Sequence, residues 1–305
     1  MATGWTAADA PDQQGRVAVV TGANTGIGFH TAAMLADRGA HVVLAVRNLD
    51  KGRRAQAQMT ARRSHVEVTL QQLDLGSLES VRAAADDLRV AYPKIDLLIN
   101  NAGVMFTRKD VTTDGFELQF GTNHLGHFAL TGLLLDRLLQ TEGSRVVTMS
   151  SPVHRMCRSI DFGDLQREKR YSRIGAYAQS KLANLLFTYE LQRRLAQRGA
   201  TTIAVAAHPG GSFTQQFQQT PILIRPLVNL VGPRVLNRPE ISALSPLRAA
   251  TAVDVRGGEY YGPDGFREVR GHPNVTRSSD LSHDDKSQQR LWEVSEELTG
   301  VRYPL

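Results

Sequence analysis

The residues best suited to chemistry in this sequence are a tyrosine and a lysine four positions apart, Tyr177 and Lys181. Four residues make roughly one helical turn, so both side chains would project from the same face of a helix. An ammonium beside a phenol favours the phenolate, and we expect it to lower the pKa of the phenol from about 10 towards neutral pH. Such a pair could serve as an acid/base for the oxygen of an alcohol or a carbonyl.

A glycine-rich turn lies upstream of this pair, over residues 21–28. It follows an apolar segment and opens a helical pattern. In that setting glycines let the backbone approach a pyrophosphate, and the free N–H groups of the helix start attract it. The turn therefore predicts binding of a dinucleotide cofactor. The residues expected to contact it are Gly22, Asn24, Thr25, Gly26, Ile27 and Gly28.

The end of the second apolar segment bears on the choice between NAD and NADP. An NAD enzyme places an acidic residue there, about 20 residues beyond the turn, to hold the ribose 2′-hydroxyl. This sequence has Val46 at that place, followed by Arg47, Asn48 and then Lys51. No carboxylate is present to repel a 2′-phosphate, and a guanidinium pairs well with one. Arg47 could also be only the polar end of a strand, but the pattern favours NADP, as NADPH, over NAD, with Arg47 and Asn48 as contacts.

The elements that must position these residues follow from a regular alternation of apolar and amphipathic segments. The apolar segments of strand length are residues 16–21, 41–46, 66–73, 95–100, 145–150 and 202–207. The helical patterns are residues 26–38, 51–63, 77–91, 113–139 and 175–197. Nearly all-apolar strands belong in a parallel sheet that is covered on both faces. The expected fold class is therefore α/β, a doubly wound parallel sheet of Rossmann type with helices on both faces.

The alternation ends after residue 207. Residues 213–240 are rich in Pro and Gln and include an apolar stretch at 222–231, which indicates a substrate lid or a subunit contact. A short strand is expected at 259–261, and a last helix over 282–298 that Ser282 caps and Gly300 follows. No linker or repeat divides the chain. We expect one domain over residues 15–305, preceded by a flexible tail over residues 1–14.

Composition and charge argue against several other classes of protein. The 305 residues are 41% hydrophobic and 22% charged, as in ordinary globular proteins, and no stretch approaches the roughly 20 apolar residues of a membrane span. The single cysteine, Cys157, and a start without a signal-peptide pattern predict a cytoplasmic protein. The net charge of +6 comes from dispersed basic residues, which disfavours nucleic acid as a partner. His124 and His127 have no third ligand at a suitable spacing, so no metal site is expected.

Further motifs stand in the order found in a known family. They are Thr21-Gly22-x3-Gly26-Ile27-Gly28, Asp74-Leu75, Asn100-Asn101-Ala102-Gly103, Asn123, Ser150-Ser151, Tyr177-x3-Lys181 and His208-Pro209-Gly210. Over about residues 15–300 the chain resembles the short-chain dehydrogenase/reductases. Within that family, Gly126-His127-Phe128, Lys181-Leu182-Ala183-Asn184 and the segment 161–171 look like the branch of the retinol dehydrogenases and protochlorophyllide reductases.

The resemblance implies a role for each residue of the catalytic set. Tyr177 would be the acid/base, and Lys181 would lower its pKa and hold the nicotinamide ribose. Ser151 would hydrogen-bond to the substrate oxygen, although the neighbouring Ser150 is open as an alternative. Asn123 would hold a water molecule on the proton path to Lys181. Taken singly, the serine could be a helix cap and the asparagine a helix breaker.

The resemblance also extends the expected cofactor site. Asp74, with Leu75 beside it, would accept a hydrogen bond from the adenine amine. The end of the fourth strand would lie against the ribose, with an alternative in which Asn100 and Asn101 tie neighbouring strands together. Residues 209–211 and Thr214 would line the nicotinamide end. These further contacts are Asp74, Leu75, Asn100, Ala102, Gly103, Pro209, Gly210, Gly211 and Thr214.

The activity implied is the NADP(H)-dependent interconversion of an alcohol and its aldehyde or ketone. The apolar stretch at 222–231 favours a lipophilic substrate, and the pocket would be built from residues 105–110, the region after Ser151, and 213–240. Two alternatives are a non-catalytic dinucleotide sensor or scaffold and a reductase of a C=C bond. The resemblance allows a homodimer or homotetramer formed through the helices at 113–139 and 175–197.

Overall fold

Eight strands form one sheet in the computed structural model, which describes residues 4–62, 66–211 and 237–305. The strands are β1 (Val17–Thr21), β2 (His41–Val46), β3 (Val68–Gln72), β4 (Leu97–Asn100), β5 (Arg145–Met149), β6 (Ile203–Ala207), β7 (Tyr260–Pro263) and β8 (Pro273–Val275). Their order is β3-β2-β1-β4-β5-β6-β7-β8. All neighbours are parallel except β7 and β8, so the expected doubly wound parallel sheet is confirmed, with one antiparallel edge strand that the sequence did not predict.

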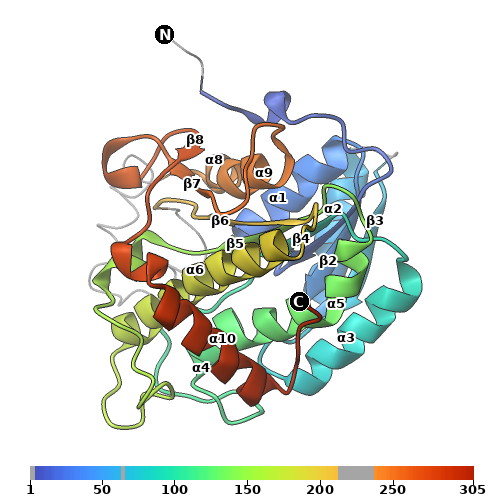
Figure 1. Ribbon diagram of the computed structural model, residues 1–305. Helices are drawn as coiled ribbons and strands as arrows, with labels where there is room; N and C mark the ends of the chain where they lie inside the picture. Colours follow the sequence, from blue (N-terminus) through green and yellow to red (C-terminus); the bar gives the residue numbers. More distant parts are fainter. Residues whose placement is uncertain (1–3, 63–65, 212–236) are drawn as a thin grey trace.

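Helices cover both faces of the sheet (Figure 1). One face carries α1 (Gly26–Asp37), α2 (Leu49–Arg62), α8 (Pro239–Ser242) and α9 (Leu244–Thr251). The other carries α3 (Leu78–Ala91), α5 (Gly126–Leu139), α6 (Arg173–Gln197) and α10 (Asp285–Thr299). Alternate strand residues enter the two cores: Val20 and Leu44 face the α1 side, whereas Val19 and Val43 face the α3 side. Burial on both faces explains why these strands are apolar throughout.

The helix expected over residues 113–139 begins later and is irregular at its start. Residues 118–120 form a short helix, α4 (Leu118–Phe120), followed by a π-helical turn, Gly121–Leu125, and only then by α5. The carboxylate of Glu117 accepts hydrogen bonds from the backbone N–H groups of Gln119 and Phe120, at 3.0 and 2.7 Å. This cap fixes the start of the helix, and the polar residues before it form a turn.

Residues 4–14, part of the tail expected over residues 1–14, are packed against the domain. Thr6 and Asp9 cap a 3-10 turn, Ala7–Asp9. The guanidinium of Arg38 donates to the carbonyl of Ala7 at 2.7 Å, and Ala10 is only 2% exposed. The segment is polar in composition, but its few apolar side chains join the core beside α1.

The last helix, α10, lies across α5 and α6 (Figure 1). The ring of Trp292 contacts Phe128 of α5 and Phe187 of α6, with centroids 5.3 and 5.9 Å apart. Asp284 caps this helix, not Ser282 as expected, because the Ser282 hydroxyl donates to the carbonyl of Ser279. Gly300 ends it with a left-handed φ of 63°, as predicted. No helix of the described residues is long and apolar enough to cross a bilayer.

The strand order reverses between β1 and β4. From β1 the chain adds strands outward to β3, and from β4 it adds them in the opposite direction to β7. In open α/β sheets the carboxyl ends of strands at such a point leave a crevice that suits ligands. The glycine-rich turn follows β1, and residues 101–104 follow β4. The fold therefore brings the two predicted cofactor segments to one place.

Candidate active site

A cleft of about 620 Å³ opens at the carboxyl ends of the strands. It is lined by segments that follow β1, β2, β3, β4, β5 and β6, by α6, and by the loop between β7 and β8. Most of the residues expected at the site line it: Gly22, Asn24, Thr25, Gly26, Ile27, Gly28, Arg47, Asn48, Asp74, Leu75, Ala102, Gly103, Ser151, Tyr177, Lys181, Pro209, Gly210 and Gly211. Thr214 and nearly all of the expected lid, residues 213–236, lie outside the described residues.

The glycine-rich turn has the geometry that a bound pyrophosphate requires. Gly22 has a left-handed φ of 67°, and a Cβ there would lie 2.9 Å from the Cβ of Ala102, so a side chain would be both strained and crowded. Thr25 stands at the N-cap of α1 but makes no side-chain cap hydrogen bond. The first N–H groups of the helix therefore stay free to meet an anion in the cleft, and the residues present fit a dinucleotide.

The rim beside β2 carries the positive charge. Arg47 follows β2 directly, and Lys51 lies one turn into α2; both side chains are exposed. The side chain of Asn48 accepts a hydrogen bond from the N–H of Lys51 at 2.9 Å, which holds the start of α2 against the cleft. Asp74 accepts the N–H of Gly76 at 2.9 Å, so one of its oxygens is engaged in shaping the turn after β3.

The two asparagines at the end of β4, Asn100 and Asn101, have different hydrogen-bond partners. Asn100 is fully buried and donates to the hydroxyl of Thr131 on α5 at 2.9 Å, and its side chain is directed away from the cleft. Asn101 ties β4 to β1, because its side-chain amide donates to the carbonyl of Thr21 at 2.8 Å. Strand tying thus describes the side chain of Asn101, whereas that of Asn100 ties β4 to α5. Ala102 and Gly103 line the cleft.

Tyr177 and Lys181 lie one turn apart on α6, as predicted, and both are buried at the floor of the cleft. The Lys181 ammonium donates to the carbonyl of Met149 at 3.1 Å and lies 5.7 Å from the centroid of the Tyr177 ring. Burial raises the pKa of Tyr177 to about 12, against the opposing effect of a hydrogen bond with Ser151. Burial also lowers the pKa of Lys181 to about 8. The expected lowering of the phenol pKa is therefore wrong for this structure, because desolvation outweighs the lowering effect of Ser151.

The two serines after β5 are distinguished by their partners. Ser150 is buried and donates to the backbone carbonyl of Lys181 at 2.8 Å. Ser151 caps the short 3-10 helix Pro152–Met156, accepting the N–H of Val153 at 3.3 Å. It also lies close enough to the phenol of Tyr177 to lower the pKa of that phenol. Its hydroxyl, rather than that of Ser150, is thus the one that meets the phenol.

Asn123 lies in the π-helical turn and is fully buried. Its side chain accepts the N–H of Val104 at 2.8 Å and donates to the carbonyl of the same residue at 2.9 Å. It also donates to the hydroxyl of Ser180 on α6 at 3.0 Å. These bonds fasten the segment after β4 to the helix that bears Tyr177. The expected role of Asn123 in holding a water molecule on the proton path stays a prediction.

His127 and His124 hold the π-helical turn in place. His127 bridges the carbonyl of Asn123 and the hydroxyl of Thr21, at 2.9 Å each, and burial lowers its pKa to about 4. His124 contacts the hydroxyl of Ser295 on α10 at 2.9 Å, and burial lowers its pKa to about 3. Both rings are therefore neutral, buried polar links between segments.

Sequence reasoning placed the pocket at residues 105–110 but did not single out Phe106, which lines the cleft next to Tyr177. Its backbone is left-handed, with φ of 54°, an arrangement that a bulky residue adopts only when its surroundings impose it. The buried side chain of Gln119 accepts the N–H of Phe106 at 2.8 Å and donates to the hydroxyl of Tyr171 at 3.0 Å. No local motif carries this information, since the contacts come from distant segments.

It also missed the loop between β7 and β8. Arg267, Glu268 and Val269 line the cleft beside residues 209–211, and the N–H of Gly211 donates to the carbonyl of Val269 at 2.8 Å. The short strand expected at 259–261 was the nearest signal in the sequence. Nothing in the residue types of the loop distinguishes it from an ordinary turn.

Comparison with known proteins gives one consistent result. The family model described as short chain dehydrogenase matches residues 16–221. Human retinol dehydrogenase 12 is 43% identical over 291 residues, which cover 95% of this chain and 88% of the relative.

Similar solved structures point to the same family. A crystal structure of an uncharacterised protein from Mycobacterium paratuberculosis has a TM-score of 0.82 and 44% identity, covering 99% of this chain and all of that chain. A short chain dehydrogenase from Shigella flexneri complexed with NADP has a TM-score of 0.64 and 25% identity, covering 81% and 96% of the two chains. The chain therefore belongs to the short-chain dehydrogenase family, as an NAD(P)-dependent oxidoreductase of its retinol dehydrogenase-like branch.

Proposed function

We propose that this enzyme interconverts a lipophilic alcohol and its aldehyde or ketone with NADP(H), and that Tyr177 is its acid/base. The observation that carries the proposal is that Ser151, Tyr177 and Lys181 line one cleft together with the glycine-rich turn. A carbonyl oxygen placed between two hydroxyls would receive two hydrogen bonds as negative charge develops on it. The glycine-rich turn lines the same cleft, so a dinucleotide bound at the turn could reach these residues.

Reduction of a carbonyl matches the protonation states of these groups. With its pKa raised to about 12, the phenol of Tyr177 is protonated at neutral pH and can donate to the forming alkoxide. Ser151 would stabilise the same oxygen without changing its own charge. The Lys181 ammonium, charged below about pH 8, favours the phenolate that is left behind. A nicotinamide cofactor bound in the cleft would supply or accept the hydride.

The basic rim supports NADP(H) as the cofactor. Arg47 and Lys51 are exposed beside the end of β2, and the end of that strand carries no carboxylate that would hold a ribose 2′-hydroxyl. A guanidinium and an ammonium at this place would pair with a 2′-phosphate. The Shigella relative with NADP bound supports the same choice.

The walls of the cleft support a lipophilic substrate. Near Tyr177 they are formed by apolar side chains, among them Met105, Phe106, Val153 and Val269. The name of the human relative, a retinol dehydrogenase, points to the same class of molecule. A C=C reductase and a non-catalytic sensor remain the alternatives, and the intact pair of Tyr177 and Lys181 disfavours the second.

Location and assembly complete the proposal. The single cysteine favours a reducing, cytoplasmic setting. A homodimer or homotetramer would have to use surfaces other than the parts of α5 and α6 that α10 covers.

The test is a calorimetric titration with NADPH and NADH, followed by an assay of NADPH consumption with retinal and a set of lipophilic aldehydes and ketones. Tighter binding of NADPH with turnover of a carbonyl supports the proposal. Tight binding without turnover would move the assignment to a sensor or a C=C reductase, and equal or weaker binding of NADPH than NADH would contradict the cofactor choice.

A further inference from the structure

Glu268 occupies an unusual position at the nicotinamide end of the cleft. It ends a short turn, Phe266–Glu268, between β7 and β8, and it lines the cleft. Both Arg267 and Glu268 have left-handed backbones, with φ of 51° and 56°. Two successive non-glycine residues in this region are strained, and such strain persists only where the surrounding contacts impose it. The contacts of the Glu268 carboxylate hold these two residues in the left-handed conformation.

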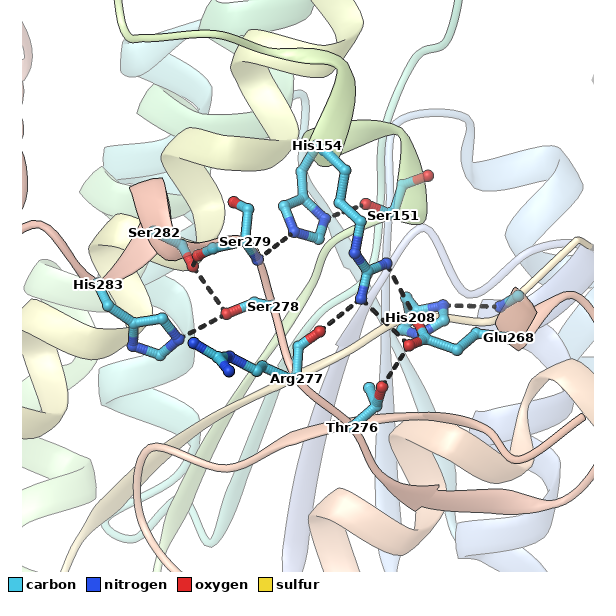
Figure 2. Close-up of polar contacts among 12 residues, drawn as sticks. Ser151, His154, His208, Glu268, Thr276, Arg277, Ser278, Ser279, Ser282 and His283 are labelled. Carbon is cyan, nitrogen blue, oxygen red and sulfur yellow. Dashed lines mark hydrogen bonds and ion pairs between the residues drawn. The ribbon is translucent and has the colours of Figure 1, made fainter. Parts of the chain in front are cut away.

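Three side chains from three different segments converge on this carboxylate (Figure 2). The guanidinium of Arg155 binds both oxygens, at 3.1 and 3.2 Å. The Nε2 of His208 lies 3.1 Å from Oε2, and the hydroxyl of Thr276 donates to Oε1 at 2.5 Å. Oε1 thus accepts from two donors and Oε2 from one, and the buried Nε2 of His208 lies beside Oε2 without the geometry of a hydrogen bond. An ionised carboxylate suits this surrounding.

Arg155 connects the carboxylate to the turn that carries Ser151. It lies in the 3-10 helix that Ser151 caps. Its neighbour His154 contacts the backbone carbonyl of Ser151 through Nδ1, at 2.6 Å, and accepts the N–H of Ser279 through Nε2, at 3.0 Å. Arg155 also donates to the backbone carbonyl of Arg277. His154 and Arg155 therefore fasten this turn to the segment that runs from β8 to α10 (Figure 2).

His208 connects the carboxylate to the turn at the nicotinamide end. It follows β6 directly and precedes residues 209–211, and it is fully buried. Its Nδ1 accepts the N–H of Gly210 at 3.2 Å, which assigns the ring proton to Nε2, facing Glu268. Burial lowers the pKa of His208, so the ring is neutral as this arrangement requires. Gly210 itself has a left-handed φ of 71°, and the histidine holds it there.

We propose that Glu268 is a positioning residue that fixes the turn bearing Ser151 relative to residues 209–211. The inference rests on the proposed function, in which the substrate oxygen meets Ser151 and the nicotinamide lies against residues 209–211. Hydride transfer depends on the separation of those two groups, and a small displacement costs much of the rate. Glu268 touches both turns through one side chain each, so its carboxylate sets their spacing while leaving the glycine-rich turn and Arg47 untouched.

Glu268→Gln tests this with almost no change in shape. Whichever way the amide lies, its NH2 group faces a nitrogen of the Arg155 guanidinium and one further donor. The histidine could turn its proton to Nδ1 only by losing the bond from Gly210. The matched control is Asp280→Asn, which makes the same chemical change in an exposed ion pair with Arg277.

The measurements are NADPH affinity, kcat and KM for a carbonyl that the wild type reduces, and the primary isotope effect with NADPH deuterated at nicotinamide C4. For Glu268→Gln we expect kcat to fall at least about tenfold, the isotope effect to rise because hydride transfer becomes rate-limiting, and NADPH affinity to change less than about threefold because most cofactor contacts lie elsewhere. The control should match the wild type in all three. Unchanged kcat and isotope effect would overturn the inference.

Arg155→Met is the second variant, and it keeps the test decisive if Glu268→Gln folds poorly. It removes the guanidinium that binds both carboxylate oxygens of Glu268, from a side chain that is 37% exposed, and should also lower kcat and raise the isotope effect. In the double variant the loss should not exceed the larger single loss, since both act through one contact. Multiplying losses would overturn the inference while leaving the proposed function intact. A wild type that reduces no carbonyl would overturn the proposed function first.

Discussion

The ring of Phe106 meets the ring of Tyr177 edge to face, with 5.1 Å between their centroids and 70° between their planes. The contact places a rigid apolar wall beside the hydroxyl that is proposed to exchange a proton with the substrate. Gln119 holds the wall in place through the Phe106 N–H. The substituents that a substrate carries next to its carbonyl must therefore fit against this ring.

Phe106→Ala should widen the range of substrates. Removing the ring opens space beside the reacting carbon, so kcat/KM for a branched ketone should rise about tenfold relative to that for an unbranched aldehyde. The measurement is the ratio of the two kcat/KM values in the wild type and the variant. A ratio that does not move would mean that the substrate lies elsewhere in the cleft.

Arg47→Asp should change the choice of cofactor. The new carboxylate repels a 2′-phosphate and can hold a ribose 2′-hydroxyl, so the ratio of NADPH to NADH affinity should fall by roughly 10- to 100-fold. Calorimetric titration of both cofactors measures it. Arg54→Asp, an equal charge change on the exposed face of α2, serves as the control; equal effects of the two substitutions would reduce the role of Arg47 to general electrostatics.

The pH dependence of carbonyl reduction should follow Lys181. Tyr177 stays protonated up to about pH 12, so the proton donor is present throughout the ordinary range. Lys181 loses its charge above about pH 8, and with it the field that favours the phenolate. The rate should be level below about pH 8 and fall above it. A rate that rises steadily through pH 8 to 10 would contradict this assignment.

Lys181→Met should stabilise the protein while removing activity. The pKa of Lys181 is lowered in the folded state, to about 8 from 10.5, so the unfolded chain binds more protons between these values and stability rises with pH across that window. Below about pH 8 the buried charge costs its full penalty. At pH 7 the variant should gain roughly 1–3 kcal/mol in urea unfolding, and a loss of stability would show that the ammonium is well compensated by Met149.

Much of the fold could be read from the sequence, because strands buried on both faces are apolar throughout and stand out against amphipathic helices. The predictions that failed concern helix ends, where neighbouring side chains compete to cap the same backbone groups. The start expected near residue 113 shifted because the Glu117 carboxylate caps later N–H groups, and the cap expected at Ser282 passed to Asp284. Such outcomes depend on which partner each polar group finds.

The parts of the candidate site that a short motif encodes could be predicted. The parts that depend on tertiary contacts could not. Tyr177, Lys181 and the glycine-rich turn are short-range patterns, and the structure brings them to one cleft. Asn100 lies off the cleft because strand alternation turns its side chain towards α5. Phe106 and Glu268 owe their roles to partners such as Gln119 and His208, which are distant in sequence and leave no local signature.

The central claim, that Tyr177 moves the proton, is tested most directly by Tyr177→Phe. The variant keeps the ring against Phe106 and removes only the hydroxyl, and Tyr92→Phe, far from the cleft beside His41, is the control. We predict NADPH affinity within about threefold of the wild type and carbonyl turnover lower by roughly 100- to 10,000-fold, with the control unaffected. Turnover of Tyr177→Phe within a few-fold of the wild type would contradict the account.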